Sequence, residues 1–225
     1  MTTPTNNGGE RVVPAPPADD LGGRLALLAP DDLDAAQREV YDALTQIVVP
    51  EAAEHGFTAR LDDGRYVGPF NALLRAPSIA MGMGAWTGRI ATSGIAADVR
   101  QAVILTVGAA WSADYEIDAH RSAARAVGLA DEAIDTIVGQ KPPTGLSHDA
   151  DIAHRLTRHL LTHQGVSDTL YHEAIAAFGE TGLVAVLCLI GQYQTISSIL
   201  VCFEVPVPSR PAGGPSTPPT RSEER

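Results

Sequence analysis

Apolar residues recur at helical spacing along most of the chain. Between residues 21 and 206 they return every three or four positions, the period that brings side chains to one face of an α-helix. One stripe begins after Pro30 and another at Pro77, whereas residues 97–111 are apolar almost all round, which is typical of a helix at the centre of a domain. No segment alternates apolar and polar positions as a half-buried strand does. The pattern predicts an all-α fold.

Prolines, glycines and capping residues set the expected helix ends. Asp31 or Asp32 can cap the first helix, and Gly128 offers a left-handed stop to a later one. The stretch Asp62-Asp63-Gly64 predicts a turn, with a short hairpin as one option. Further helices are expected at about residues 112–127, 131–139, 149–163, 168–178 and 181–203.

The two ends differ from the rest in composition. Residues 1–20 and 207–225 are rich in Pro, Gly, Ser and Thr, so they are predicted to be disordered tails around one helical domain over 21–206. The first tail also lacks the apolar core of a signal peptide. The most hydrophobic stretch, 183–203, is interrupted by Gly191, which favours a buried core helix over a membrane span. We therefore expect a cytoplasmic protein without membrane contact.

Charge and cysteine content argue against several classes of protein. The formal net charge is −11, which disfavours binding to nucleic acid and leaves any anionic substrate dependent on local cations. The two cysteines, Cys188 and Cys202, form no C-x-x-C motif, so thiol redox chemistry and cysteine zinc sites lose their usual signature. His159 and His163 have the spacing of a metal pair, but no third ligand is evident. No metal and no cofactor is expected.

An ionisable pair falls on the inner face of the helix expected at 112–127. Glu116 and His120 are four residues apart, among alanines and Ile117. Burial moves the pKa values of such groups toward neutrality, which suits acid–base catalysis. A structural pair that merely joins two helices would give the same pattern, so the spacing alone leaves both interpretations open.

Four segments together resemble the carboxymuconolactone decarboxylase family, which shares its fold with the alkyl hydroperoxidase D-like proteins. The resemblance implies an all-α bundle, a homo-oligomer of three or more chains, and catalysis without a cofactor. The segments are Gly68-Pro69-Phe70-Asn71-Ala72-Leu73-Leu74 with Pro77; Asp98-Val99-Arg100-Gln101-Ala102-Val103-Ile104-Leu105; Tyr115-Glu116-Ile117-Asp118-Ala119-His120 with Ala124 and Gly128-Leu129; and Gly182-Leu183-Val184 with Gly191-Gln192-Tyr193.

The chain departs from that family at two points. The C-x-x-C of the peroxidase-like members is replaced by Ala113 and Glu116, so thiol peroxidase activity is not expected. Gln101 stands where members often carry Glu. A carboxamide can bind a substrate or orient His120, but it cannot take up a proton.

The resemblance implies decarboxylation of a small carboxylated lactone or a similar enolisable anion. His120 is then expected to donate or shuttle the proton, and Glu116 to fix its tautomer. An isomerase, dehydratase or cyclase acting on a secondary metabolite is the alternative, and a non-catalytic oligomer that binds a small ligand or a protein is another. The expected pocket wall comprises Gln101, Trp111, Tyr115 and Tyr193, with Arg89 or Arg100 as the cation.

Overall fold

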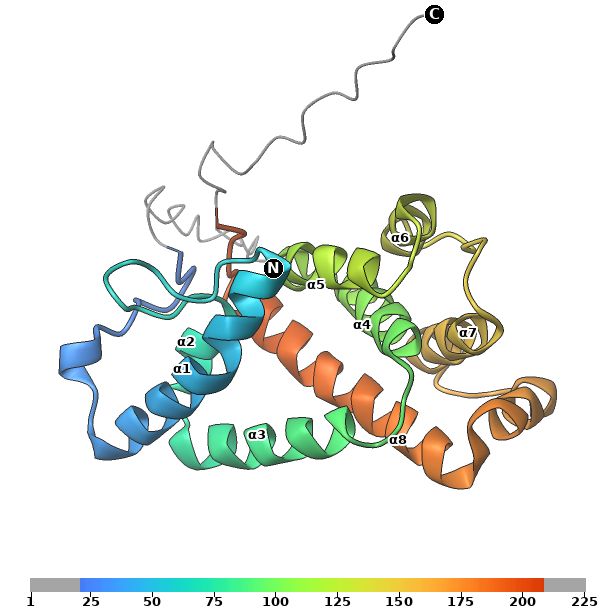
Figure 1. The fold of residues 1–225 in the computed structure, drawn as a ribbon, viewed down its shortest axis with the longest axis horizontal. Coiled ribbons are helices and arrows are strands. Elements are labelled where there is room, and N and C mark those ends of the chain that lie inside the picture. Colours follow the sequence, from blue (N-terminus) through green and yellow to red (C-terminus); the bar gives the residue numbers. More distant parts are fainter. Residues whose placement is uncertain (1–20, 209–225) are drawn as a thin grey trace, which may run out of the picture.

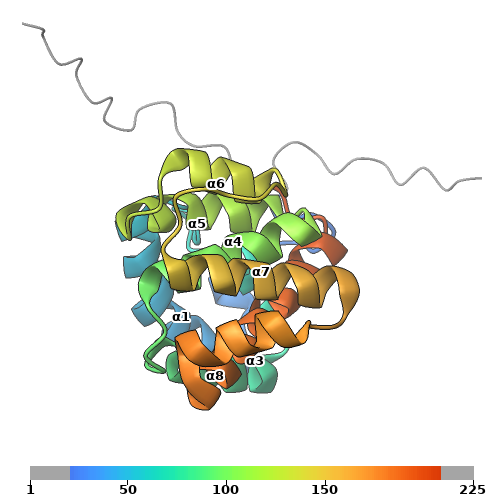
Figure 2. The ribbon, with the colours of Figure 1, turned by 90° about the vertical axis from the view of Figure 1, so that its right-hand side faces the viewer.

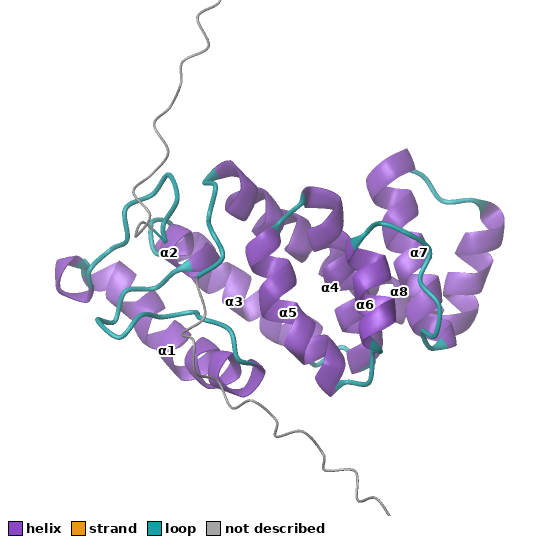
Figure 3. Ribbon diagram, turned by 90° about the horizontal axis from the view of Figure 1, so that it is seen from above, coloured by secondary structure: helices purple, strands orange, loops and turns teal. Residues whose placement is uncertain are grey.

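The fold is all-α, as the apolar pattern predicts. A computed structural model describes residues 21–208; the predicted tails, apart from residues 207 and 208, lie outside this range. Within it the chain forms helices joined by loops and no strand (Figures 1 and 3). The α-helices are α1 (Ala35–His55), α2 (Gly68–Leu73), α3 (Pro77–Ala91), α4 (Ala97–Trp111), α5 (Asp114–Ala126), α6 (Asp131–Val138), α7 (His148–His163) and α8 (Asp168–Cys202).

Helix α4 is the centre of the domain. Every residue from Ala102 to Ala109 is buried, which explains why this segment is apolar on all sides. Helices α5, α6, α7 and α8 all pack against it. Seen from the side of α7, α6 and α8 lie above and below that helix, with α4 behind it (Figure 2). Residues of α4 therefore belong, together with residues of α7 and α8, to the largest apolar cluster among the described residues.

The first three helices form a second layer beside this core (Figure 1). The capping residue of α1 is Asp34, whose carboxylate accepts from the Gln37 amide in a capping box. The prediction of Asp31 or Asp32 was wrong because Pro30–Asp32 forms a separate 3-10 turn. Pro77 opens α3 as predicted.

Two local features of the loops bear on the site. The turn at Gly64 closes no full hairpin: one antiparallel bridge joins Arg60 to Tyr66. The short helix α2 is not among the predicted helices, although its Gly-Pro-Phe start belongs to the first of the four resembling segments. Gly68 has φ +66, and a Cβ there would lie 2.3 Å from the Tyr115 ring, so only glycine fits.

Helix α8 departs from the prediction of a buried core segment. The two helices expected at 168–178 and 181–203 are both present, and they meet at a kink where Gly179 is non-helical. Among the helices described, α8 alone has the length and hydropathy to cross a bilayer. The core helix of a soluble protein is mostly buried, but only 28% of the apolar window of α8 is buried. Leu189 packs inside, whereas Val184 and Leu187 are exposed. The apolar run is therefore core on one face only.

Candidate active site

Glu116 places a carboxyl group in the interior between three helices. Its side chain is 3% exposed, and Oε2 accepts a 2.9 Å hydrogen bond from the Ser197 hydroxyl of α8. On the other side it meets α4 at Gly108, where a Cβ would stand 3.8 Å from Oε1. Oε1 is buried and has no hydrogen-bond partner among residues 21–208. A buried carboxyl with one free oxygen is costly when ionised.

Burial makes Glu116 a carboxylic acid at neutral pH. Desolvation raises its pKa from 4.5 to about 8, and the hydrogen bond from Ser197 opposes this only in part. Because Oε2 already accepts from Ser197, the proton belongs on Oε1. Glu116 therefore presents an O–H donor.

His120 is held in one tautomer by Gln101. Its Nδ1 lies 3.0 Å from Gln101 Oε1 of α4. An amide oxygen only accepts, so Nδ1 carries the hydrogen and Nε2 keeps a lone pair. The imidazole also lies edge-to-face on Tyr193 of α8, with ring centroids 5.3 Å apart. Burial, assisted by the nearby His55 of α1, lowers the pKa of His120 to about 4, so the ring is a neutral proton acceptor at neutral pH.

The predicted coupling of Glu116 to His120 is absent from the described residues. No hydrogen bond joins the two side chains; Glu116 is bound to Ser197 and His120 to Gln101. Gln101 therefore orients the His120 ring in place of Glu116. Orienting His120 is one of the two roles expected of Gln101. Glu116 and His120 occupy separate environments on one face of α5.

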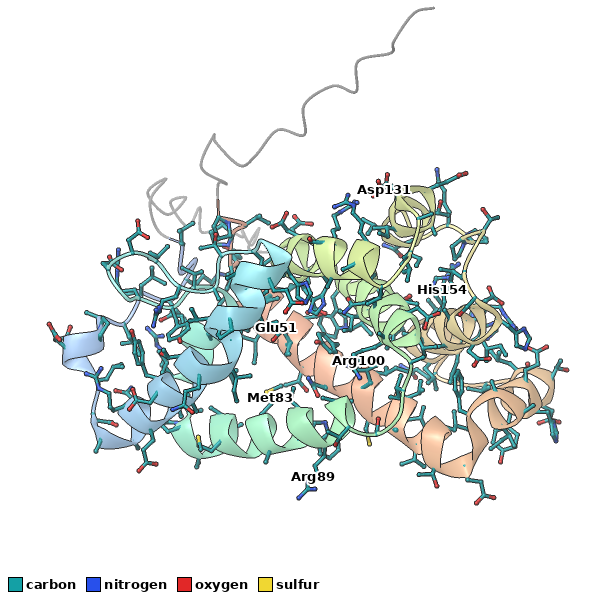
Figure 4. All side chains as sticks on the ribbon, viewed as in Figure 1. Glu51, Met83, Arg89, Arg100, Asp131 and His154 are labelled. Atoms are coloured by element: carbon teal, nitrogen blue, oxygen red, sulfur yellow. The ribbon has the colours of Figure 1, made fainter. Side chains whose placement is uncertain are left out.

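Charged groups from two further helices surround Tyr193. Burial raises the pKa of Tyr193, the negative charges of Glu116 and Glu51 raise it further, and the Arg100 charge opposes them. Glu51 lies on α1 and Arg100 on α4, and both are labelled in Figure 4. Gln101, His120 and Tyr193 are partly exposed, whereas Glu116 is buried.

Arg100 is the cation that the fold brings to this cluster. Its Nη2 donates to the Ala91 carbonyl at 3.1 Å. Its Nε–H is buried and unpartnered within residues 21–208. A buried donor of this kind can bind an anionic oxygen.

Three predicted pocket residues lie elsewhere. Arg89 is exposed and points away from the cluster on the outer side of α3 (Figure 4). Trp111 is exposed at the end of α4. Tyr115 is buried on the far side of α5, where its hydroxyl donates to the Thr58 carbonyl at 2.6 Å. Tyr115 therefore anchors the helix instead of lining the site.

Sequence reasoning missed four contributors to the cluster. Ser197 lies one turn after Tyr193 on α8, and Gly108 lies on the central helix beneath Glu116. Glu51 and His55 stand one turn apart on α1. The spacing from Tyr193 to Ser197 was a usable signal, because residues four apart share a helix face.

A cavity that does not include the acid–base cluster lies beside α1. It has a volume of about 680 Å³ and is lined by α1 and the 57–64 loop, including Tyr41, Phe57 and Arg60. Neither Glu116 nor His120 lines it. We place the candidate site at the cluster of perturbed groups because chemistry depends on those groups and not on volume.

Among residues 21–208, no group of three or more His, Cys, Asp or Glu side chains is arranged to hold an ion. His159 and His163 do approach one another, with ring centroids 5.3 Å apart.

No protein-family model, no curated protein and no solved structure matches this chain. The site offers a protonated acid, a neutral base of fixed tautomer, and a buried cation donor.

Proposed function

We propose that this protein is a cofactor-free acid–base enzyme acting on a small carboxylated, enolisable compound. The proposal rests on the opposite pKa shifts of two residues in adjacent environments. The pKa of Glu116 is raised and the pKa of His120 is lowered. One keeps its proton at neutral pH and the other stays free to accept one. Pairs of groups whose pKa values are driven apart in this way are typical acid and base partners.

In the reaction we favour, a carboxylate is converted to CO2 and a C–H bond. The C–C bond to CO2 breaks, and its electron pair moves into a conjugated carbonyl. The resulting enolate takes the Glu116 Oε1 proton at carbon. His120 Nε2 then accepts a proton from solvent and passes it on to Glu116, which restores the acid. Arg100 binds an anionic oxygen of the substrate.

Isomerisation is the second candidate, because acid and base are separate side chains. His120 would remove a proton from one carbon, and Glu116 would deliver one to another, with no loss of mass. The four sequence segments that resemble those of carboxymuconolactone decarboxylases favour the decarboxylating reaction. They also underlie our proposal that the helices adopt the alkyl hydroperoxidase D-like arrangement.

We also propose that copies of the chain associate through α3 and α8. Ile79 and Trp86 on α3, and Val184 on α8, expose 66%, 49% and 58% of their surface. Apolar groups of this size gathered on two helices are typical of protein contacts. A bilayer suits this surface less well, because α8 packs along α4 and α7 and the net charge of −11 repels anionic lipid.

The experiment is a screen of small unsaturated lactone and keto acids, read by CO2 release and by product mass. Glu116→Gln keeps an acceptor for Ser197 but removes the acidic proton, so turnover should fall at least about 100-fold. His120→Ala should abolish turnover while leaving the helical circular dichroism unchanged. Asp114→Asn removes an exposed carboxylate from the same helix and serves as the matched control. Full activity in Glu116→Gln and His120→Ala would refute the proposal.

A further inference from the structure

A second buried histidine lies apart from the acid–base cluster. His154 of α7 is 2% exposed and stands where α4, α7 and the end of α6 meet. Figure 4 shows it on the α6–α7 side, well separated from Glu51. Its Nδ1 lies 2.8 Å from the Thr106 hydroxyl of α4. This histidine has no part in the proposed reaction.

Thr106 determines which ring nitrogen of His154 carries hydrogen. The Thr106 hydroxyl donates its single hydrogen to the Ala102 carbonyl at 2.6 Å. Toward the imidazole it can therefore only accept, so Nδ1 is the N–H. Burial lowers the pKa of His154 to about 4, which keeps the ring neutral. Nε2 is left as an acceptor.

His154 also lines a small cavity of mixed polar and apolar side chains. Nε2 is buried and has no hydrogen-bond partner among residues 21–208, and a buried acceptor left without a donor is unfavourable. His154 lines a cavity of about 30 Å³ together with Arg158, Gln140 and Thr162. This volume exceeds what one water requires. Within the same residues no carboxylate lies within ion-pair distance of the Arg158 guanidinium.

We propose that this cavity binds an oxygen ligand that donates one hydrogen to His154 Nε2 and accepts from Arg158. Two sources provide this chemistry: water, and a small hydroxyl-bearing oxyanion such as bicarbonate. Chloride and acetate carry no hydrogen for Nε2, so the site discriminates against them although Arg158 is a cation. The inference is independent of the proposed enzymatic function.

The test is long-range 1H–15N NMR on the full chain labelled with 15N-histidine, at about pH 7. Bicarbonate, chloride and acetate are titrated at constant ionic strength, and a crystal structure is determined. A saturable shift of the His154 Nε2 signal with bicarbonate alone identifies the oxyanion. No ion effect, with an ordered water oxygen at Nε2 in the crystal, identifies water. Equal shifts with chloride or acetate, or no oxygen at Nε2, would overturn the proposal.

Thr106→Val replaces the threonine by a side chain of nearly the same shape. It should reverse the preference of the cavity for a hydrogen-donating ligand over chloride and acetate. Without the hydroxyl, Nδ1–H loses its acceptor, the hydrogen moves to Nε2, and acetate or chloride becomes the better ligand. Arg158→Met should weaken anion binding roughly tenfold while leaving the tautomer unchanged. Circular dichroism checks that both variants fold. An unchanged tautomer in folded Thr106→Val would contradict the inference.

Discussion

Replacing Glu116 by Gln should change how stability depends on pH. In the folded chain the pKa of Glu116 is raised from 4.5 to about 8, and each pKa unit corresponds to about 1.4 kcal/mol. Ionised Glu116 therefore opposes folding by up to about 5 kcal/mol, the product of the two. Between pH 4.5 and about 8 the unfolded chain releases this proton while the folded chain keeps it. The contribution of Glu116 to stability is thus largest below pH 4.5 and falls as pH rises to about 8.

The histidines require the comparison to be made as a difference. The folded pKa values of His120 and His154 are lowered from 6.5 to about 4, so their contribution to stability rises with pH in that window. This trend opposes that of Glu116 and is common to wild type and variant. Subtracting the two free energies of unfolding cancels it.

The assay is urea unfolding followed by circular dichroism at several pH values. From about pH 5.5 to about pH 7.5 the stability of Glu116→Gln relative to wild type should increase by about 2 to 3 kcal/mol. Asp114→Asn, on the same helix but exposed, should show no such trend. A difference between Glu116→Gln and wild type that stays constant with pH would show that Glu116 ionises normally, and the reasoning would be refuted.

Three other changes test separate parts of the structure. Gln101→Glu puts a carboxylate at Nδ1 and should raise the pKa of His120 above its wild-type value of about 4 in an NMR titration; an unchanged midpoint would rule out the contact. Gly68→Ala combines φ +66 with a clash on the Tyr115 ring and should lower the free energy of unfolding by at least about 2 kcal/mol, measured in urea; a loss below about 1 kcal/mol would contradict this. Trp86→Glu should reduce the mass measured by light scattering toward the 23.6 kDa of one chain, unless α3 is not the contact.

The helical pattern determined much of the fold. Apolar residues on all sides of 97–111 predicted the central helix, which is α4. Gly128 follows the end of α5 with φ +96, the left-handed conformation expected of it. Helical spacing predicted that Glu116 lies on the inner face of its helix, and the residue is 3% exposed. Such predictions succeed because they depend only on local spacing.

The hydrogen-bond partners could not be predicted in the same way. Ser197 is 81 positions from Glu116, and Gln101 is 19 positions from His120. Helix periodicity says which side chains face inward but not which helix meets them there. Glu116 and His120 were therefore paired with each other, although each is bound to a different helix. The exposed face of α8 was missed for the same reason, because an apolar run does not say how many helices cover it.

The most direct test of the account is the titration of the Glu116 carboxyl carbon by 13C NMR, with Glu116→Gln to assign the signal. A protonated carboxyl group at about pH 7 and a midpoint at about 8 are predicted, while His120 remains neutral with its hydrogen on Nδ1. A midpoint near the ordinary 4.5 would leave no acid at Glu116 and would contradict the account.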